Sequence, residues 1–126
     1  MSEQRTVDEV VQGHKYISLT TLRKTGKGVA TPVWFVQREG KLCVWTVADS
    51  GKVKRLRNNS RITLAPCTMR GEILGPALEG EARVVSPEEK EEARRLFVKK
   101  YGWQMHFFAF LHRNHERVVV EITPDP

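Results

Sequence analysis

Residues 29–48 read VATPVWFVQREGKLCVWTVA, and this stretch decides the fold class. Two runs rich in β-branched and aromatic residues flank Glu39-Gly40, so the stretch predicts a β-hairpin with strands over 29–37 and 41–48. Alternate side chains of the second strand face opposite ways and both sets are largely apolar, so we expect it to be covered on both faces. Pro32 removes one backbone donor, which indicates a sheet edge, a bulge or a place where something other than a strand approaches.

Further segments have the composition of short strands bounded by turn signals. They cover residues 16–22, 61–67, 78–85 and 117–123. Six short, mostly antiparallel strands predict a mainly β protein with a few helices, closed into a barrel that leaves no exposed strand edge. A length of 126 residues and the lack of a linker predict a single domain over residues 1–126.

Helices are expected between some of the strands. Ser86-Pro87-Glu88-Glu89 combines an N-cap serine, a proline at the first helical position and a glutamate three residues after the cap, and Gly102 ends the helix that follows. We interpret the charged residues of this helix as its solvated face. A shorter helix is expected over 53–58, and a turn or two over 7–11.

The distribution of charge singles out one segment. The net charge of +6 suits nucleic acid, an acidic membrane or a phosphorylated small molecule. Between Lys52 and Arg61 lie five cations and no carboxylate, at the start of a helix that follows a strand. Backbone N–H groups and the helix dipole favour an anion there, and Thr46 and Ser50 add hydroxyl donors. On these residues alone, a solvated basic helix with Ser50 as a plain N-cap remains the alternative.

Other reactive side chains give weaker signals. Cys43 and Cys67 are interpreted as small core residues, because no metal-ligand spacing surrounds them. Three histidines, His106, His112 and His115, lack an acidic or cysteine partner, so we expect no metal site. The first residues lack the apolar core of a secretory signal, and a cytoplasmic protein is the simplest expectation.

Taken together, several segments resemble the split-barrel flavin and deazaflavin oxidoreductases related to pyridoxamine-phosphate oxidase, and more narrowly their branch that uses coenzyme F420. The segments follow the family's order over roughly residues 15–123. They are Lys15 to Thr21, Ala30 to Trp34, Val44 to Thr46, Asp49 to Asn58, Thr63 to Cys67, Gly75-Pro76, Glu79 to Ala82 and Val120 to Ile122. The resemblance implies a six-stranded antiparallel split β-barrel of the FMN-binding kind, and a homodimer with its cofactor sites at the interface.

The resemblance also implies the residues of the cofactor site. Those near the cofactor phosphate are Thr46, Ser50, Lys52, Lys54 and Arg55, with Arg57 and Arg61 as further cations toward the acidic tail of F420. Those lining the ring system are Thr31, Pro32, Val33 and Trp34. Core or dimer packing is the alternative for Trp34, and it is the favoured interpretation for Trp45. Gly75-Pro76 and Gly80 either border the ring or merely shape a loop.

We therefore expect an F420-dependent oxidoreductase that transfers a hydride between the cofactor and a small unsaturated organic substrate, with FMN as the alternative cofactor. No order of residues indicates another catalytic apparatus, and the proton donor is left open between solvent, His14, Tyr101 and His106. A second interpretation is a non-catalytic protein that binds a flavin, a deazaflavin or a tetrapyrrole. A third, a barrel for single-stranded nucleic acid, is disfavoured by the carboxylates within 72–92. We expect neither nucleic acid nor a membrane as partner.

Overall fold

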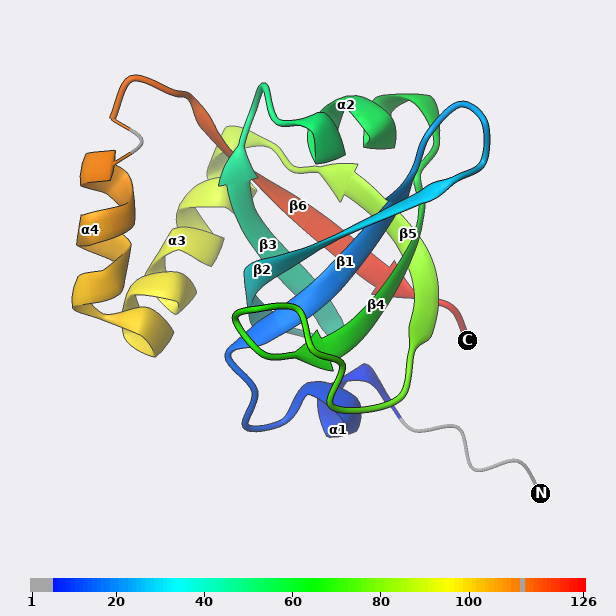
Figure 1. Ribbon diagram of the computed structural model, residues 1–126. Helices are drawn as coiled ribbons and strands as arrows, with labels where there is room; N and C mark the ends of the chain where they lie inside the picture. The colour runs from blue at the N-terminus through cyan, green and yellow to red at the C-terminus, as the bar shows by residue number, and fades with distance from the viewer. Residues whose placement is uncertain (1–5, 112) are drawn as a thin grey trace.

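The computed structural model describes residues 6–111 and 113–126. Within them, six antiparallel strands close a barrel in the order β1-β2-β3-β6-β5-β4 (Figure 1). The strands are β1 (Tyr16–Leu22), β2 (Gly28–Arg38), β3 (Lys41–Val47), β4 (Arg61–Cys67), β5 (Leu78–Val84) and β6 (Arg117–Pro124). The helices are α1 (Val7–Val11), α2 (Gly51–Asn58), α3 (Pro87–Tyr101) and α4 (Trp103–Leu111). The expected mainly β, six-stranded barrel is confirmed.

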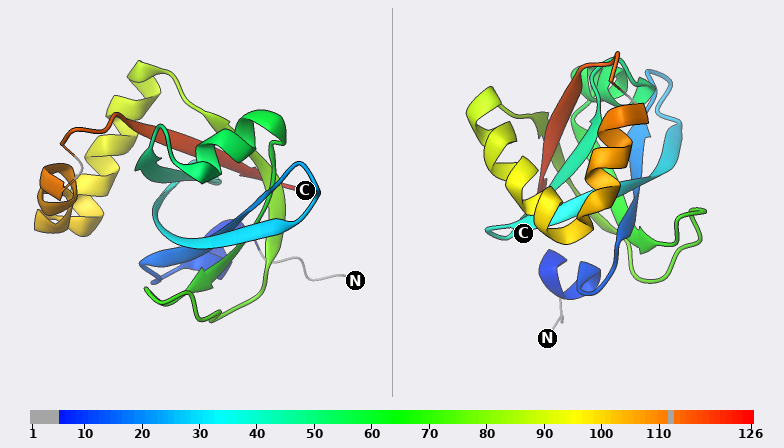
Figure 2. Two further views of the ribbon diagram at one scale, coloured as in Figure 1. Left: turned by 45° about the horizontal axis from the view of Figure 1, so that its top comes forward. Right: turned by 90° about the vertical axis from the view of Figure 1, so that its left-hand side faces the viewer.

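Two hydrophobic cores hold the molecule together. One fills the barrel and contains Leu42 and Val44 of β3. The other lies outside the barrel, where α3 and α4 cover one side of it, and contains Cys43 and Trp45 of the same strand (Figure 2). Successive side chains of a strand point to opposite faces, so β3 contributes to both cores. The expectation that this strand is covered on both faces is confirmed, and both cysteines are buried and free.

The ends of the helices follow their capping residues. The hydroxyl of Ser86 accepts a hydrogen bond from Glu89 N at the start of α3, and Gly102, with φ of 59°, ends it as expected. The hydroxyl of Ser50 caps α2 in the same way, so this helix begins at Gly51, two residues before the predicted start. None of the described helices is long and apolar enough to cross a membrane.

The strands β2 and β3 separate part-way along their length. They pair only from Phe35–Val44 to the turn. Beyond that point β2 continues along β1, and β3 continues along β6. One edge of each strand is therefore left without a neighbouring strand, and this divergence is the split of the barrel. Pro32 lies on the diverging part of β2, where its missing N–H costs no hydrogen bond of the ladder.

Candidate functional site

A pocket of about 330 Å³ lies where β2 and β3 diverge. Strands β1, β2 and β3, the start of α2 and one side chain of α4 line it. Six of the residues predicted for a cofactor site are among its lining residues: Pro32, Val33, Trp34, Thr46, Ser50 and Lys52. The structure therefore brings together the segment predicted for a ring system and most of the segment predicted for a phosphate.

Aromatic side chains form one wall of this pocket. Trp34 stacks on Tyr101, with ring centroids 4.6 Å apart and an interplanar angle of 12°. Phe108 of α4 lies against the same indole, 5.5 Å between centroids, and Tyr16 is the partner of Trp34 across β1 and β2. Flat aromatic faces of this kind suit a planar ring. Sequence reasoning missed Tyr16 as a lining residue, and the strand register is the signal that could have found it.

The hydroxyl of Tyr101 fixes this wall to the barrel. It accepts a hydrogen bond from Phe35 N at 3.0 Å and lies within donating distance of the carbonyl oxygens of Lys15 (2.7 Å) and Phe35 (2.9 Å). Burial raises the pKa of this phenol above its ordinary value. Because its hydroxyl is bound to the backbone, Tyr101 is held in place and in turn positions the Trp34 ring that stacks on it. It is poorly suited to the role of proton donor that the sequence had left open.

The opposite end of the pocket is basic. Lys52 Nζ donates to Thr46 Oγ1 at 3.3 Å, and Arg55 Nε donates to Thr21 Oγ1 at 2.6 Å. A Cβ on Gly51 would lie 2.8 Å from Arg55 Nη1, so glycine at this position lets the guanidinium fold back over the start of α2.

The cations of α2 have no acidic counterpart in the part of the chain that the structure describes. Among the described residues, no carboxylate lies within ion-pair distance of Lys52, Lys54, Arg55 or Arg57. Burial, and then the nearby charge of Arg55, lower the pKa of Lys52. An anion bound at the helix start would offset both effects, because it supplies the missing opposite charge.

Three of the predicted site residues do not line the pocket. Thr31 lies on the same face of β2 as Val33 but is not among the residues around the pocket, and its buried hydroxyl has no described partner. Lys54 is exposed on α2. Arg55 is not a lining residue, and its guanidinium is held by the hydrogen bond to the Thr21 hydroxyl. Of the further cations, Arg57 is exposed on α2. Arg61 is held by Glu81 and Asp125, with nitrogen–oxygen distances of 3.3 and 2.6 Å.

The histidines form no metal site among the described residues. His106 is exposed on α4, and Nδ1 of His115 lies 3.9 Å from a carboxylate oxygen of Asp49. His112 lies outside the described residues. His14 is half-buried just before β1 and does not line the pocket at the split.

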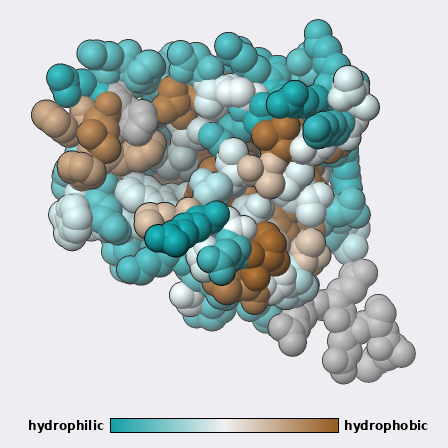
Figure 3. Space-filling view, viewed as in Figure 1, coloured by the Kyte–Doolittle hydropathy of each residue, from teal (hydrophilic) through white to brown (hydrophobic). Residues whose placement is uncertain are grey.

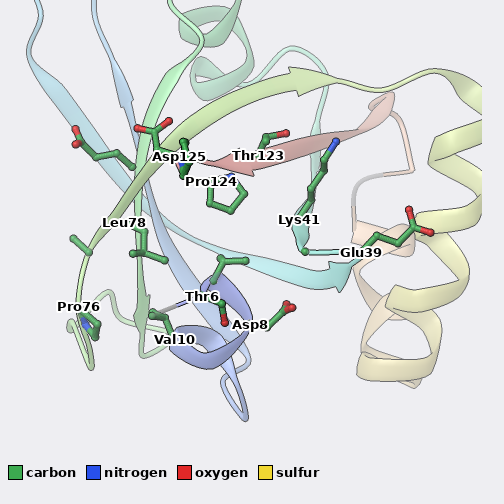
Figure 4. Close-up of a pocket in the computed structure, with 15 residues that line it drawn as sticks. Thr6, Asp8, Val10, Glu39, Lys41, Pro76, Leu78, Thr123, Pro124 and Asp125 are labelled. Carbon is green, nitrogen blue, oxygen red and sulfur yellow. The ribbon is translucent and has the colours of Figure 1, made fainter. Parts of the chain in front are cut away.

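A larger cavity of about 1010 Å³ lies beside α1, at the end of the barrel away from α2 (Figures 1 and 4). Side chains from α1, the β2–β3 turn and the C-terminal residues surround it (Figure 4). The carboxylates among its lining residues are those of Asp8, Glu39, Glu79 and Asp125. Lys41 is the one cation among the described lining residues, and it pairs with Glu121 at 3.6 Å. This charge distribution disfavours a phosphate, so the smaller pocket is the better candidate.

The unpaired groups of the smaller pocket fit a flat, anionic ligand. The separated edges of β2 and β3 carry backbone groups that no strand uses, and α2 adds cations without carboxylates. The indole nitrogen of Trp45 is buried without a described acceptor. Donors and cations around a flat aromatic wall match the acceptors and the phosphate of a flavin-type cofactor.

Comparison with known families agrees with this geometry. A family model described as pyridoxamine 5'-phosphate oxidase matches residues 4–125. The chain belongs to this family. The pyridoxamine 5'-phosphate oxidase family binds flavins, which accords with the ring wall and the basic helix start. A search of curated proteins found no significant match.

Solved structures share the fold at low sequence identity. Conserved hypothetical protein Rv2991 from Mycobacterium tuberculosis has a TM-score of 0.74 at 19% identity, over 100% of this chain and 82% of that one. A suggested 5-nitroimidazole antibiotic resistance protein from Bacteroides thetaiotaomicron has a TM-score of 0.71 at 12% identity, with the same coverages of 100% and 82%. The heme storage protein HutZ from Vibrio cholerae has a TM-score of 0.70 at 15% identity, over 98% and 92%.

Proposed function

We propose that this protein is an oxidoreductase that binds coenzyme F420 in the pocket at the split and transfers a hydride between it and a small unsaturated organic substrate. FMN is the alternative cofactor. One observation carries the proposal: the same pocket contains the aromatic wall at Trp34 and the start of α2, whose cations have no carboxylate partner among the described residues. The family membership supports the flavin-like half of the proposal.

The protein's own part in this reaction is to bind and to orient. Backbone N–H groups at the start of α2, with Lys52 and Arg55, hold the phosphate. Trp34 and Phe108 border the ring and keep water from one side of it. A bound deazaflavin or flavin supplies a ring that accepts or donates a hydride. The described lining residues include neither a carboxyl group nor a histidine, and Lys52 is assigned to the phosphate, so solvent is the proposed proton source.

The preference for F420 over FMN rests on cations beyond the pocket. Lys54 and Arg57 are exposed on α2 without an acidic partner among the described residues. A cofactor that continues past its phosphate into an acidic tail would meet these charges, whereas FMN ends at the phosphate. Each such contact between exposed groups is worth little on its own, about 1 kcal/mol or less, so we expect a modest preference.

A homodimer is the proposed assembly, and α4 supports it. Trp103, Phe107, Phe110 and Leu111 are 73%, 55%, 62% and 57% exposed and share the outward face of this helix. Figure 3 shows the hydrophobic side chains gathered over α4. Contiguous exposed apolar surface on a helix is typical of an interaction site. Because Phe108 of the same helix borders the pocket, a second copy seated on α4 would also lie close to the bound ligand.

A non-catalytic binding protein is the second candidate. It is favoured by the lack of a carboxyl group or a histidine among the described pocket residues, and the fold is shared with a heme storage protein. Its ligand would be a flavin, a deazaflavin or a tetrapyrrole.

One experiment separates these candidates. Apo-protein is titrated with F420, FMN and hemin, and the complex with reduced F420 is then mixed with an electron-poor nitroaromatic acceptor in a single turnover. The proposal predicts saturable binding of F420, tighter than that of FMN, and reoxidation faster than that of free reduced F420. Saturable binding without accelerated reoxidation would favour the binding protein. Failure of both deazaflavin and flavin to bind would reject both the proposed cofactor and the proposed site.

A further inference from the structure

Trp45 lies at the fork of the split. Phe35 and Val44 are the last pair between β2 and β3, so the next residues outward, Trp34 and Trp45, stand on either side of the point where the strands separate. Both indoles line the pocket. They differ in burial, because Trp45 is only 7% exposed, whereas Trp34 is half-buried. Trp45 is therefore the more firmly held of the two.

Packing against other side chains explains why the Trp45 ring is buried, but it does not supply an acceptor for the indole N–H. Its ring lies 5.6 Å from that of Phe97 in α3, and the side chain belongs to the outer core. The indole N–H is buried, and no described group accepts a hydrogen bond from it. Buried tryptophan N–H groups ordinarily find an acceptor, and an unpaired buried donor in a native structure calls for an explanation.

Trp45 also borders the pocket at the split, so a ligand there that displaces the side chains covering the nitrogen meets an unsatisfied donor. We infer that the Trp45 indole N–H donates a hydrogen bond to an acceptor on the edge of the bound ring, and so selects rings that carry a carbonyl oxygen or an unprotonated ring nitrogen there. This inference rests on the proposed function. It adds a positioning and specificity residue to that function: Trp34 meets the face of the ring and Trp45 meets its edge.

The candidate ligands differ in the acceptors that their rings would offer to the Trp45 N–H. The pyrimidine edge of flavins and deazaflavins presents carbonyl oxygens and a ring nitrogen. The porphyrin ring of hemin presents carbon–hydrogen bonds and alkyl groups along its edge, its nitrogens face inward, and its acceptors are the carboxylates of two propionate side chains that extend beyond the ring. A site built to hydrogen-bond a ligand rejects one that lacks the matching group, because the buried donor is then left unpaired. A donor fixed at the edge of the ring thus matches the acceptors within a flavin-type ring and finds none within the porphyrin ring itself.

The direct test uses the three tryptophans of the chain as reporters. Protein labelled with ¹⁵N gives one indole N–H signal for each, assigned by the single variants Trp34→Phe and Trp103→Phe. On titration with FMN and with F420, we expect the Trp45 proton signal to move downfield and its exchange with deuterium to slow. The inference is overturned if the ligand binds, shown by a shift of the Trp34 signal, while the Trp45 signal keeps its position and exchange rate. Absence of binding by both ligands would overturn the proposed function as well, so the two failures are distinguishable.

A variant provides the second arm. Trp45→Phe keeps an aromatic ring but removes the donor, and thermal unfolding establishes that it folds. We expect it to weaken FMN and F420 binding about tenfold, the effect of one neutral hydrogen bond, and to leave hemin binding unchanged. Equal weakening of all three ligands would mean that Trp45 acts only through packing. If the variant does not fold, the measurement on the wild-type protein still decides.

Discussion

Replacement of Lys52 by methionine tests the basic end of the pocket. The ammonium lies in the lining of the pocket, donates to Thr46, and has no carboxylate partner among the described residues. A hydrogen bond between charged groups contributes about 1.5–3 kcal/mol, and partial exposure of Lys52 places the expected loss in the lower part of that range. We expect the dissociation constants of F420 and FMN to rise about 10- to 40-fold in Lys52→Met.

The assay is isothermal titration of purified apo-protein with each cofactor at fixed salt, because phosphate contacts weaken as ionic strength rises. Lys99→Met is the matched control: it removes the same charge from an exposed position in the last turn of α3. It should change the dissociation constants less than about twofold. Lys54→Met is expected to fall between the two, since Lys54 is exposed and outside the pocket. Equal affinities in wild type and Lys52→Met would refute the assignment of the phosphate to this site.

Loss of affinity in this variant should not come from unfolding. Burial lowers the pKa of Lys52, so the folded apo-protein holds this charge at a cost. Methionine removes the charge but keeps most of the length of the side chain. We therefore expect the melting temperature of apo Lys52→Met to equal or exceed that of wild type, which separates a binding defect from a folding defect.

Three further outcomes test other parts of the structure. Tyr101→Phe removes the hydroxyl that holds Phe35 and should cost about 1–3 kcal/mol of unfolding free energy, measured by denaturant titration; an unchanged midpoint would contradict the positioning role. Burial lowers the pKa of Lys100 to about 8 in the folded protein, whereas a lysine in the unfolded chain has a pKa of about 10.4. Between these two pH values the unfolded state binds more protons, so the free energy of unfolding rises with pH. Thermal unfolding of Lys100→Met from pH 7 to 10 should lack this rise, and parallel curves for the variant and the wild type would refute the lowered pKa. Phe107→Ser with Phe110→Ser should convert the proposed dimer to a monomer in light scattering, whereas an unaltered mass would place the interface elsewhere.

The strands and the capped helices could be predicted from the sequence because their signals are local. A short run of apolar, β-branched and aromatic residues marks β3, and the Ser86 cap with Gly102 marks both ends of α3. The helix α4 was not predicted as a separate element, since Trp103–Leu111 is apolar on nearly all sides and shows neither a capping residue nor a polar stripe.

The parts of the site that sequence reasoning could not place depend on contacts between distant segments. Tyr16 enters the pocket through its pairing with Trp34, and Phe108 enters because α4 folds back against β2. Thr31 was predicted to line the ring, but it is not among the residues around the pocket, whereas Val33 on the same face of β2 is. Arg61 is held by carboxylates from β5 and from the end of the chain, a pairing that no local pattern indicates.

The most direct measurement of the central claim is deuterium exchange of the backbone amides with and without bound F420. The account predicts slowed exchange at 30–34, on the separated edge of β2, and at 45–56, from the end of β3 through the start of α2, where the pocket lies. It predicts no change at 6–10 and 123–125, which border the larger acidic cavity. Protection of these latter segments, with 45–56 unaffected, would contradict the account by placing the cofactor at the opposite end of the barrel.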